Sequence, residues 1–168
     1  WGDGDNYAKM VIQGRSTTPN ANDRIFQFIR EENGAPNEVA ASNTANLGEA
    51  FPDTFYVRYT SDGSNLRASY SADGVDFTAM SETKSLHGLV NPKIGLVALA
   101  NDGSVPAVVD AKFDWFHITP DDKATAAGPD DEFEGTSLDG CRWDGVVRPD
   151  ASGLRVTGGK LEIDTTPT

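Results

Sequence analysis

The chain has 168 residues and carries 14 Lys and Arg against 26 Asp and Glu, which gives a net charge of −12. This length fits one ordinary domain, or one domain with a fragment of a second. The acidic balance argues against nucleic acid and membrane surfaces as partners, because both require a basic surface. The single cysteine, Cys141, excludes an internal disulfide and a thiolate zinc cage. No signal peptide is expected, because the first residues are neither basic nor apolar, and the Asn-, Asp- and Gly-rich acidic composition is compatible with secretion.

Apolar and polar residues alternate with a period of two along most of the apolar segments, which predicts β-strands. The predicted strands are 7–13, 24–30, 54–60, 66–71, 93–100 and 111–118. The segment 93–100 is apolar almost throughout, which is typical of a strand buried on both faces. Four aromatic side chains are expected to fill the core: Phe26, Phe28, Phe113 and Trp115.

Tight turns are predicted between these segments at four dipeptides, Asn33-Gly34, Asp62-Gly63, Asp73-Gly74 and Asp102-Gly103. Glycine tolerates the positive φ angles that tight hairpins need. No segment of useful length has the 3.6-residue period of an amphipathic helix. The predicted class is therefore all-β and antiparallel, with two sheets packed as a sandwich.

The composition changes after residue 118. Residues 119–130 are rich in Asp, Ala and Pro and contain no apolar side chain larger than Ala, so they are interpreted as an acidic linker. Residues 131–168 again contain short strand-like segments, similar to the opening strands of a β domain. Three regions are thus expected: strands in 1–118, a linker in 119–130, and opening strands in 131–168.

Several spaced motifs within residues 1–118 follow the order seen in a known family. They are Asp5-Asn6-Tyr7-Ala8-Lys9-Met10, the hairpin Phe55–Thr60 with Asp62-Gly63 and Ala68–Phe77, and finally Lys93–Ala98 followed by Phe113–Phe116. Together they resemble the concanavalin A-like lectin/glucanase jelly rolls. The similarity is greatest to the branch found at the C-termini of bacterial β-xylosidases and in secreted multidomain proteins of actinobacteria. The resemblance implies an antiparallel jelly-roll sandwich.

The segment 131–168 resembles the beginning of the same family, although it follows the rest in the chain. Asp131–Asp139, Arg142-Trp143 and Gly158–Ile163 carry this resemblance. Either the chain spans the end of one copy and the start of the next in a tandem array, or the order is permuted and 131–168 completes the sandwich. In both cases some family strands are missing, and a partner chain, a cleaved-off piece or a strand-swapped neighbour would supply them.

Paired carboxylates are the first candidates for catalytic chemistry, because hydrolytic relatives of this fold carry acids at alternate positions of one strand. The candidate pairs are Glu132 with Glu134 and Glu162 with Asp164. Neither has the longer acid series of those relatives, so both are interpreted as solvated strand faces. His87 and His117 have no nucleophile motif beside them. We expect no catalytic residue and no enzyme activity in this chain.

Structural calcium is the one cofactor that the sequence indicates. Asp3, Asp5 and Asn6 lie in one loop and provide the hard oxygen ligands that calcium prefers, and jelly-roll lectins commonly hold calcium. Ordinary turn chemistry is the alternative explanation for these residues, because a complete calcium-binding loop is absent.

Sugar binding requires aromatic platforms for the apolar face of a pyranose and polar side chains for its hydroxyl groups. The candidate residues are Trp1, Tyr7, Gln13, Gln27, Arg30, Tyr56, Arg58 and Trp143. The expected function is that of a non-catalytic carbohydrate-binding or accessory module of a secreted glycan-active protein, with a polysaccharide or oligosaccharide as partner. A glycoside hydrolase of the same fold and a structural spacer in a repeat array are the alternatives.

Overall fold

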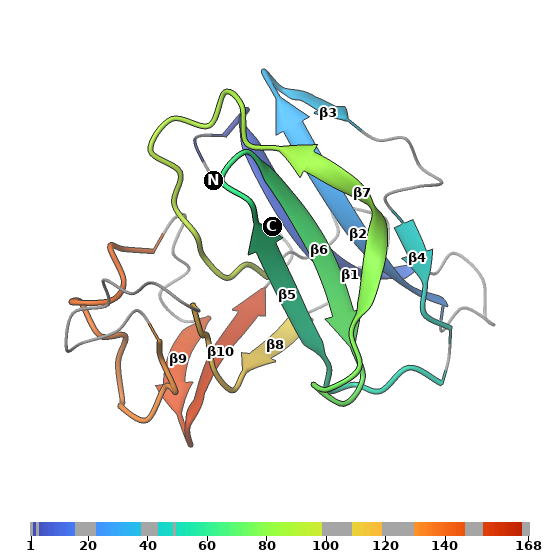
Figure 1. Cartoon of the computed structure of the whole chain (residues 1–168). Helices are drawn as coiled ribbons and strands as arrows, with labels where there is room; N and C mark the ends of the chain where they lie inside the picture. The colour runs from blue at the N-terminus through green and yellow to red at the C-terminus, as the bar shows by residue number, and fades with distance from the viewer. Residues whose placement is uncertain are drawn as a thin grey trace. The chain divides into compact units, whose positions relative to one another are not determined.

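The computed structural model describes residues 2, 4–15, 23–37, 44–48, 50–98, 109–118, 130–146 and 153–165 (Figure 1). Within these ranges the chain forms β-strands and no helix, and all paired strands are antiparallel. The all-β, antiparallel class is therefore confirmed, while the jelly-roll topology stays a prediction. The same ranges contain no helix with the length and hydrophobicity that a membrane crossing requires. The chain divides into two units, Trp1–Gly95 and Leu96–Thr168.

The first sheet of the N-terminal unit is built around a strand that is buried on both faces. Its strands are β1 (Tyr7–Arg15), β2 (Asp23–Glu32), β3 (Ala35–Asn37) and β4 (Thr44–Asn46), with β2 pairing with each of the other three. Phe26 and Phe28 project from one face of β2 and are fully buried. Ile25 and Ile29 alternate with them and are also buried, so β2 is the central element of this sheet.

The second sheet of this unit is a meander of three strands joined by tight turns. The strands are β5 (Tyr56–Ser61), β6 (Asn65–Ser71) and β7 (Thr78–Ser85), paired in that order. Gly63 and Gly74, in the two connections, have φ angles of 88° and 78°. These values confirm that Asp62-Gly63 and Asp73-Gly74 are turns that require glycine. Asn33-Gly34 is confirmed in the same way, with φ angles of 51° and 73°, whereas Asp102-Gly103 lies outside the described residues.

The two sheets face one another across a hydrophobic core, and Figure 1 shows β5, β6 and β7 lying in front of β1 and β2. Phe26 and Phe28 from the first sheet meet Ala68 and Met80 from the second. The ring of Phe26 also packs against Tyr70, with ring centroids 5.0 Å apart. Burying a phenylalanine contributes about 1.5–3 kcal/mol, so this cluster is the main source of stability for a sandwich-like unit.

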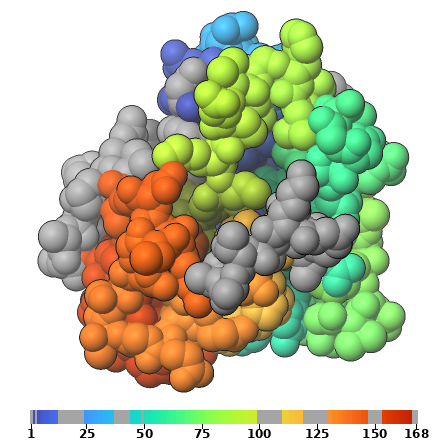
Figure 2. Space-filling view, turned by 60° about the vertical axis from the view of Figure 1, so that its left-hand side comes forward, coloured from blue at the N-terminus to red at the C-terminus, as the bar shows by residue number. Residues whose placement is uncertain are grey.

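The apolar segment that follows β7 is not a buried strand, which corrects the prediction for residues 93–100. Residues 93–98 have no regular secondary structure, and Ile94 and Val97 are 64% and 48% exposed. In Figure 2 the yellow-green chain of residues 86–95 lies on the surface of the face shown. The composition of the segment favours a strand, but no neighbouring strand pairs with the described part of it, and pairing is what creates a strand.

The second unit contains one three-stranded sheet and its own core. The strands are β8 (Val109–Phe113), β9 (Leu154–Thr157) and β10 (Lys160–Thr165), in the order β8-β10-β9. Phe133, Val156 and Leu161 are buried at the centre of the core, and the side chains of Phe113, Phe116 and Trp143 pack around them. Within the strand-like segment 158–163, residues 160–163 belong to β10, and Gly158-Gly159 form the turn between β9 and β10.

Trp115 does not belong to this core, contrary to the prediction. β8 ends at Phe113, and the predicted continuation to residue 118 consists only of an isolated bridge between Phe116 and Asp131. Phe116 turns its ring toward the core. Trp115 precedes it and remains 42% exposed, because neighbouring residues of an extended chain point to opposite sides.

Residues from 131–168 pair with the earlier part of the same chain inside this unit. β10 pairs with β8 from Leu161↔Phe113 to Thr165↔Val109, and the bridge of Phe116 with Asp131 adds a second connection. The linker predicted at 119–130 lies outside the described residues except for Asp130. The division into 1–118, 119–130 and 131–168, and the permuted order, stay predictions.

Candidate functional site

The structure distributes the eight residues predicted to bind sugar over several separate places. Trp1 and the side chain of Gln13 lie outside the described residues. Tyr7 and Arg30 come together at one end of the first sheet, and Gln27 lies further along β2, opposite Val11 of β1. Tyr56 and Arg58 lie on β5 in the second sheet. Trp143 belongs to the core of the other unit.

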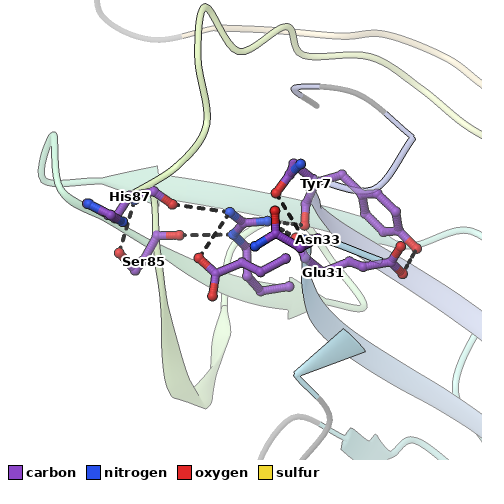
Figure 3. Close-up of polar contacts among 8 residues, drawn as sticks. Tyr7, Glu31, Asn33, Ser85 and His87 are labelled. Atoms are coloured by element: carbon purple, nitrogen blue, oxygen red, sulfur yellow. Dashed lines mark hydrogen bonds and ion pairs between the residues drawn. The ribbon is translucent and has the colours of Figure 1, made fainter. Parts of the chain in front are cut away.

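Arg30 is a buried cross-link between the two sheets of the first unit. Figure 3 labels four of the residues that it contacts, Tyr7, Glu31, Ser85 and His87. Its guanidinium group donates to five acceptors, which are the carbonyl oxygens of Tyr7, Glu31, Ser85 and His87 and the carboxylate of Glu32. The bonds to Ser85 and His87, at 3.3 and 3.2 Å, reach the end of β7 and the residues after it. Arginine has five N–H donors, so none remains for a ligand.

Tyr7 is held in the same cluster by its hydroxyl group. Tyr7 Oη donates to Glu31 Oε2 at 2.6 Å, across the β1–β2 ladder where the two residues are paired. The ammonium group of Lys9 lies 5.4 Å from the centroid of the Tyr7 ring. The hydroxyl group of Tyr7 is thus engaged in a hydrogen bond and a cation lies over its ring. These contacts give Tyr7 a structural role in this cluster.

The loop considered for calcium supports the turn between β2 and β3. Asn6 Oδ1 accepts a hydrogen bond from the backbone N–H of Asn33 at 3.1 Å, and the Asp5 carbonyl accepts one from Gly34 at 3.0 Å. Asp3 lies outside the described residues. Among the described residues, no group of three His, Cys, Asp or Glu side chains is placed to hold a metal ion. Calcium binding by Asp3, Asp5 and Asn6 stays a prediction, and the contacts of Asp5 and Asn6 fit the turn explanation.

A pocket of about 200 Å³ lies at the end of the second sheet, where β6 enters its turn toward β7. Its walls combine two aromatic rings with two carboxylates and small polar groups, and the residues are Phe51, Tyr70, Ser71, Ala72, Asp73, Asp76 and Thr78. The rings of Phe51 and Tyr70 meet edge to face, with centroids 5.9 Å apart. The pocket therefore presents apolar ring surface beside hydrogen-bond acceptors.

The turn itself fixes the carboxylate of Asp73. Asp73 Oδ1 accepts hydrogen bonds from the backbone N–H groups of Asp76 and Val75, at 2.9 and 2.8 Å, and from Ser71 Oγ at 2.8 Å. These bonds, first that of Asp76 and then those of Val75 and Ser71, hold the pKa of Asp73 below its ordinary value. Asp73 is therefore ionised at neutral pH, and its orientation is set before any ligand arrives.

Tyr56 and Arg58 flank the same turn from the outer face of β5. The Tyr56 ring lies directly against Gly74, where a β-carbon would come within 3.1 Å of the ring atoms. The guanidinium carbon of Arg58 lies 3.6 Å from the centroid of the Phe77 ring, a cation–π contact. Two of the predicted sugar-binding residues thus border the turn that carries Asp73.

Trp143 packs against the core of the second unit. Its indole Nε1 donates to Asp131 Oδ2 at 2.6 Å, and its ring packs against Phe116 and Phe133 with centroids 5.5 and 6.0 Å apart. Asp131 is buried and also accepts the backbone N–H of Phe133 at 2.8 Å. Trp143 is therefore half-buried with its polar atom satisfied, and it offers little surface to a sugar.

Three of the four carboxylates proposed for catalysis, Glu132, Glu162 and Asp164, are engaged in ion pairs. Arg155 Nη2 lies 2.9 Å from Glu162 and 2.7 Å from Asp164, and Lys112 lies 3.4 Å from Glu162. Arg155, with a smaller contribution from Lys112, holds the pKa of Glu162 below its ordinary value. Glu132 forms a close pair with His117, and Glu134 is exposed.

Comparisons of the chain with known protein families, with curated proteins and with solved structures find no match.

Sequence reasoning missed the residues that line the pocket. Asp73 was recognised only as a turn residue, and Phe51 and Asp76 lie outside the predicted strands. One signal was available, because Asp73 and Asp76 follow an aromatic strand residue, Tyr70, within a single hairpin. An acidic turn after an aromatic strand end places both kinds of group at one edge of the sheet.

Proposed function

We propose that the chain is a non-catalytic carbohydrate-binding module with a concanavalin A-like jelly-roll fold, an accessory part of a secreted glycan-active protein. The observation that carries the proposal is the pocket at the β6–β7 turn, in which Phe51 and Tyr70 stand beside Asp73 and Asp76. Aromatic rings pack on the C–H face of a pyranose, and carboxylates accept hydrogen bonds from its hydroxyl groups. One pocket thus offers both halves of sugar recognition.

The size of the pocket is in keeping with a single sugar unit. Its volume of about 200 Å³ is smaller than the roughly 300–1,000 Å³ of pockets that enclose drug-sized ligands. We infer that it takes one residue of a glycan, while Tyr56 and Arg58 at the same turn contact the adjoining unit. Such a site binds weakly by itself, and repetition along a polysaccharide raises the overall affinity.

The absence of catalysis is part of the proposal and is supported by the state of the paired acids. A general acid at neutral pH needs a raised pKa, whereas the pairing with Arg155 lowers the pKa of Glu162. Its neighbour Asp164 shares the same arginine. The alternatives are a glycoside hydrolase that uses Glu132 with Glu134 or Glu162 with Asp164, and a spacer module that binds no glycan.

The permuted order of the family's strands also belongs to the proposal. The pairing of β10 with β8, and the bridge between Asp131 and Phe116, support the idea that residues 131–168 fold onto the preceding part of their own chain. The strands that the family has between these segments would come from a partner chain or a swapped neighbour.

Affinity electrophoresis in gels containing xylan, arabinan or β-glucan tests the binding function. The wild-type chain should be retarded by at least one of these polysaccharides. Asp73→Asn should weaken this retardation, with a dissociation constant raised roughly tenfold or more, because the variant loses a charged acceptor for a sugar hydroxyl group. Phe51→Ala should have a comparable effect through the loss of ring contact.

Asp62→Asn is the matched control for Asp73→Asn. Asp62 Oδ1 accepts backbone N–H groups of Ser64 and Asn65, at 2.9 and 2.7 Å, in the β5–β6 turn, so it plays the same part in its turn as Asp73 does. It lies outside the pocket. Equal retardation of the two variants would contradict the pocket assignment, and no retardation of the wild type would favour the spacer. Glycan cleavage that disappears in Glu132→Gln or Glu162→Gln would favour the hydrolase.

A further inference from the structure

Trp115 and His117 form an exposed aromatic pair on the second unit, away from its core. Their ring centroids are 4.5 Å apart and the ring planes are inclined by 30°. Trp115 is 42% exposed, and the side chain of His117 is 38% exposed. A large indole ring held in contact with an imidazole and open to solvent is uncommon for a residue whose only task is packing, since tryptophan is generally well buried.

A carboxylate completes this surface. Glu132 Oε1 is in close contact with His117 Nε2. The side chain of Glu132 is 55% exposed. The ring pair therefore has a solvent-exposed carboxylate at its edge, and a carboxylate is a hydrogen-bond acceptor for a ligand donor.

The backbone beneath these three side chains is well supported. Phe116, between Trp115 and His117, exchanges two backbone hydrogen bonds with Asp131, at 2.9 and 2.8 Å, and turns its ring toward Trp143. Asp131 precedes Glu132, so the bridge fixes the distance between the aromatic pair and the carboxylate. The surface is thus preorganised, which lowers the entropy lost when a ligand binds.

We propose that Trp115, His117 and Glu132 form a second glycan-contact site, which receives one pyranose ring. The indole face takes the C–H surface of the sugar, and Glu132 accepts a hydrogen bond from one of its hydroxyl groups while His117 orients the carboxylate. This inference rests on the proposed carbohydrate-binding function, but it concerns a site in the second unit that shares no residue with the pocket at the β6–β7 turn.

The test follows indole N–H signals by NMR in the ¹⁵N-labelled full chain during titration with hexasaccharides prepared from xylan, arabinan and β-glucan. Trp115→Phe identifies the Trp115 signal by its disappearance. That signal should shift saturably with at least one hexasaccharide, both in the wild type and in Phe51→Ala, whose first pocket is impaired. Glu132→Gln should raise the dissociation constant read from this signal roughly fivefold to tenfold.

Glu134→Gln is the control, because Glu134 is an exposed acid on the same segment and should leave the titration unchanged. If the backbone amide of Asp73 shifts while the Trp115 signal does not move, the second site is wrong and the proposed function stands. If the Trp115 signal moves alone, the second site stands and the pocket assignment is wrong. No shift at either place with any of the three sugars overturns both. Equal effects of Glu132→Gln and Glu134→Gln overturn the role of Glu132.

Discussion

At the scale of single residues, two tyrosines of the first unit differ in whether the hydroxyl group has a hydrogen-bond partner. The hydroxyl group of Tyr59 is buried, and within the described part of the chain no hydrogen bond of standard geometry satisfies it. Burial raises the pKa of Tyr59, an effect that the backbone of Met10 opposes only in part. The hydroxyl group of Tyr7, by contrast, donates to Glu31 at 2.6 Å. Buried polar groups without partners cost stability, so Tyr59 is a position where the native side chain is not optimal.

We expect Tyr59→Phe to leave the free energy of unfolding unchanged or to raise it, because the ring still packs against Phe28 and the desolvated hydroxyl group is gone. Tyr7→Phe is the control, and it should lower the free energy of unfolding by about 1 kcal/mol through the loss of its hydrogen bond. Urea denaturation followed by circular dichroism measures both. A larger loss in Tyr59→Phe than in Tyr7→Phe would mean that the Tyr59 hydroxyl group has a strong partner.

At the scale of the elements, the two hairpin turns of the second sheet use glycine for different reasons. Gly63 and Gly74 both have positive φ angles, which side chains other than glycine rarely adopt. A β-carbon at Gly63 would meet no atom within 4 Å, whereas at Gly74 it would meet the ring of Tyr56 at 3.1 Å. The turn between β6 and β7 therefore depends on glycine for its backbone and also for its packing.

Gly63→Ala should lower the free energy of unfolding by about 1–2 kcal/mol, the cost of a left-handed conformation. Gly74→Ala should lower it by roughly 1–3 kcal/mol more, because overpacking against Tyr56 is added. Urea denaturation of both variants, of Tyr56→Ala, and of Gly74→Ala combined with Tyr56→Ala separates the cost of the backbone conformation from the cost of overpacking. Measured against Tyr56→Ala alone, Gly74→Ala should cost about as much as Gly63→Ala, and a larger cost in that background would contradict the packing explanation.

Alternation of apolar residues was sufficient to predict β1, β2, β5 and β6, because each contributes apolar side chains to the core between the two sheets. It missed β7, which carries Lys84 at a buried position, and the three-residue strands β3 and β4, which are too short to show a period. It also predicted a strand at 93–100, where the described residues have no pairing partner. The candidate sites lie at turns and strand ends, where tertiary contacts decide which side chains meet. Single-sequence reasoning therefore named Tyr56 and Arg58 as candidates but neither Phe51 nor Trp115.

At the scale of the whole molecule, the acidic chain holds several of its carboxylates in contacts that lower their pKa values. The backbone N–H groups of Ser64 and Asn65 lower the pKa of Asp62, those of Asp76 and Val75 lower that of Asp73, and Arg155 lowers that of Glu162. The ionised form of each of these carboxylates is more stable in the folded chain than in the unfolded chain. The unfolded state therefore takes up protons first as the pH falls.

Stability should accordingly be full at neutral pH and should decrease as the pH falls below the ordinary carboxyl values of 3.8 for Asp and 4.5 for Glu. Thermal unfolding measured in steps from about pH 7 to about pH 2.5 checks this. The combined variant Asp62→Asn, Asp73→Asn and Glu162→Gln should have a flatter profile over the acid range. A wild-type midpoint that stays constant or rises below about pH 4 would contradict this assignment.

The position of β10 between β8 and β9 determines the order in which the second unit is able to fold. β9 and β10 are separated by two residues, so their hairpin closes locally, on a timescale of about 1–10 μs. β8 ends at Phe113 and β10 begins at Lys160, so their pairing must close a much longer loop, and the entropy cost grows with loop length. The hairpin should therefore form first and serve as the template on which β8 docks, which makes residues 154–165 the nucleus of this unit and β8 its last strand to arrive.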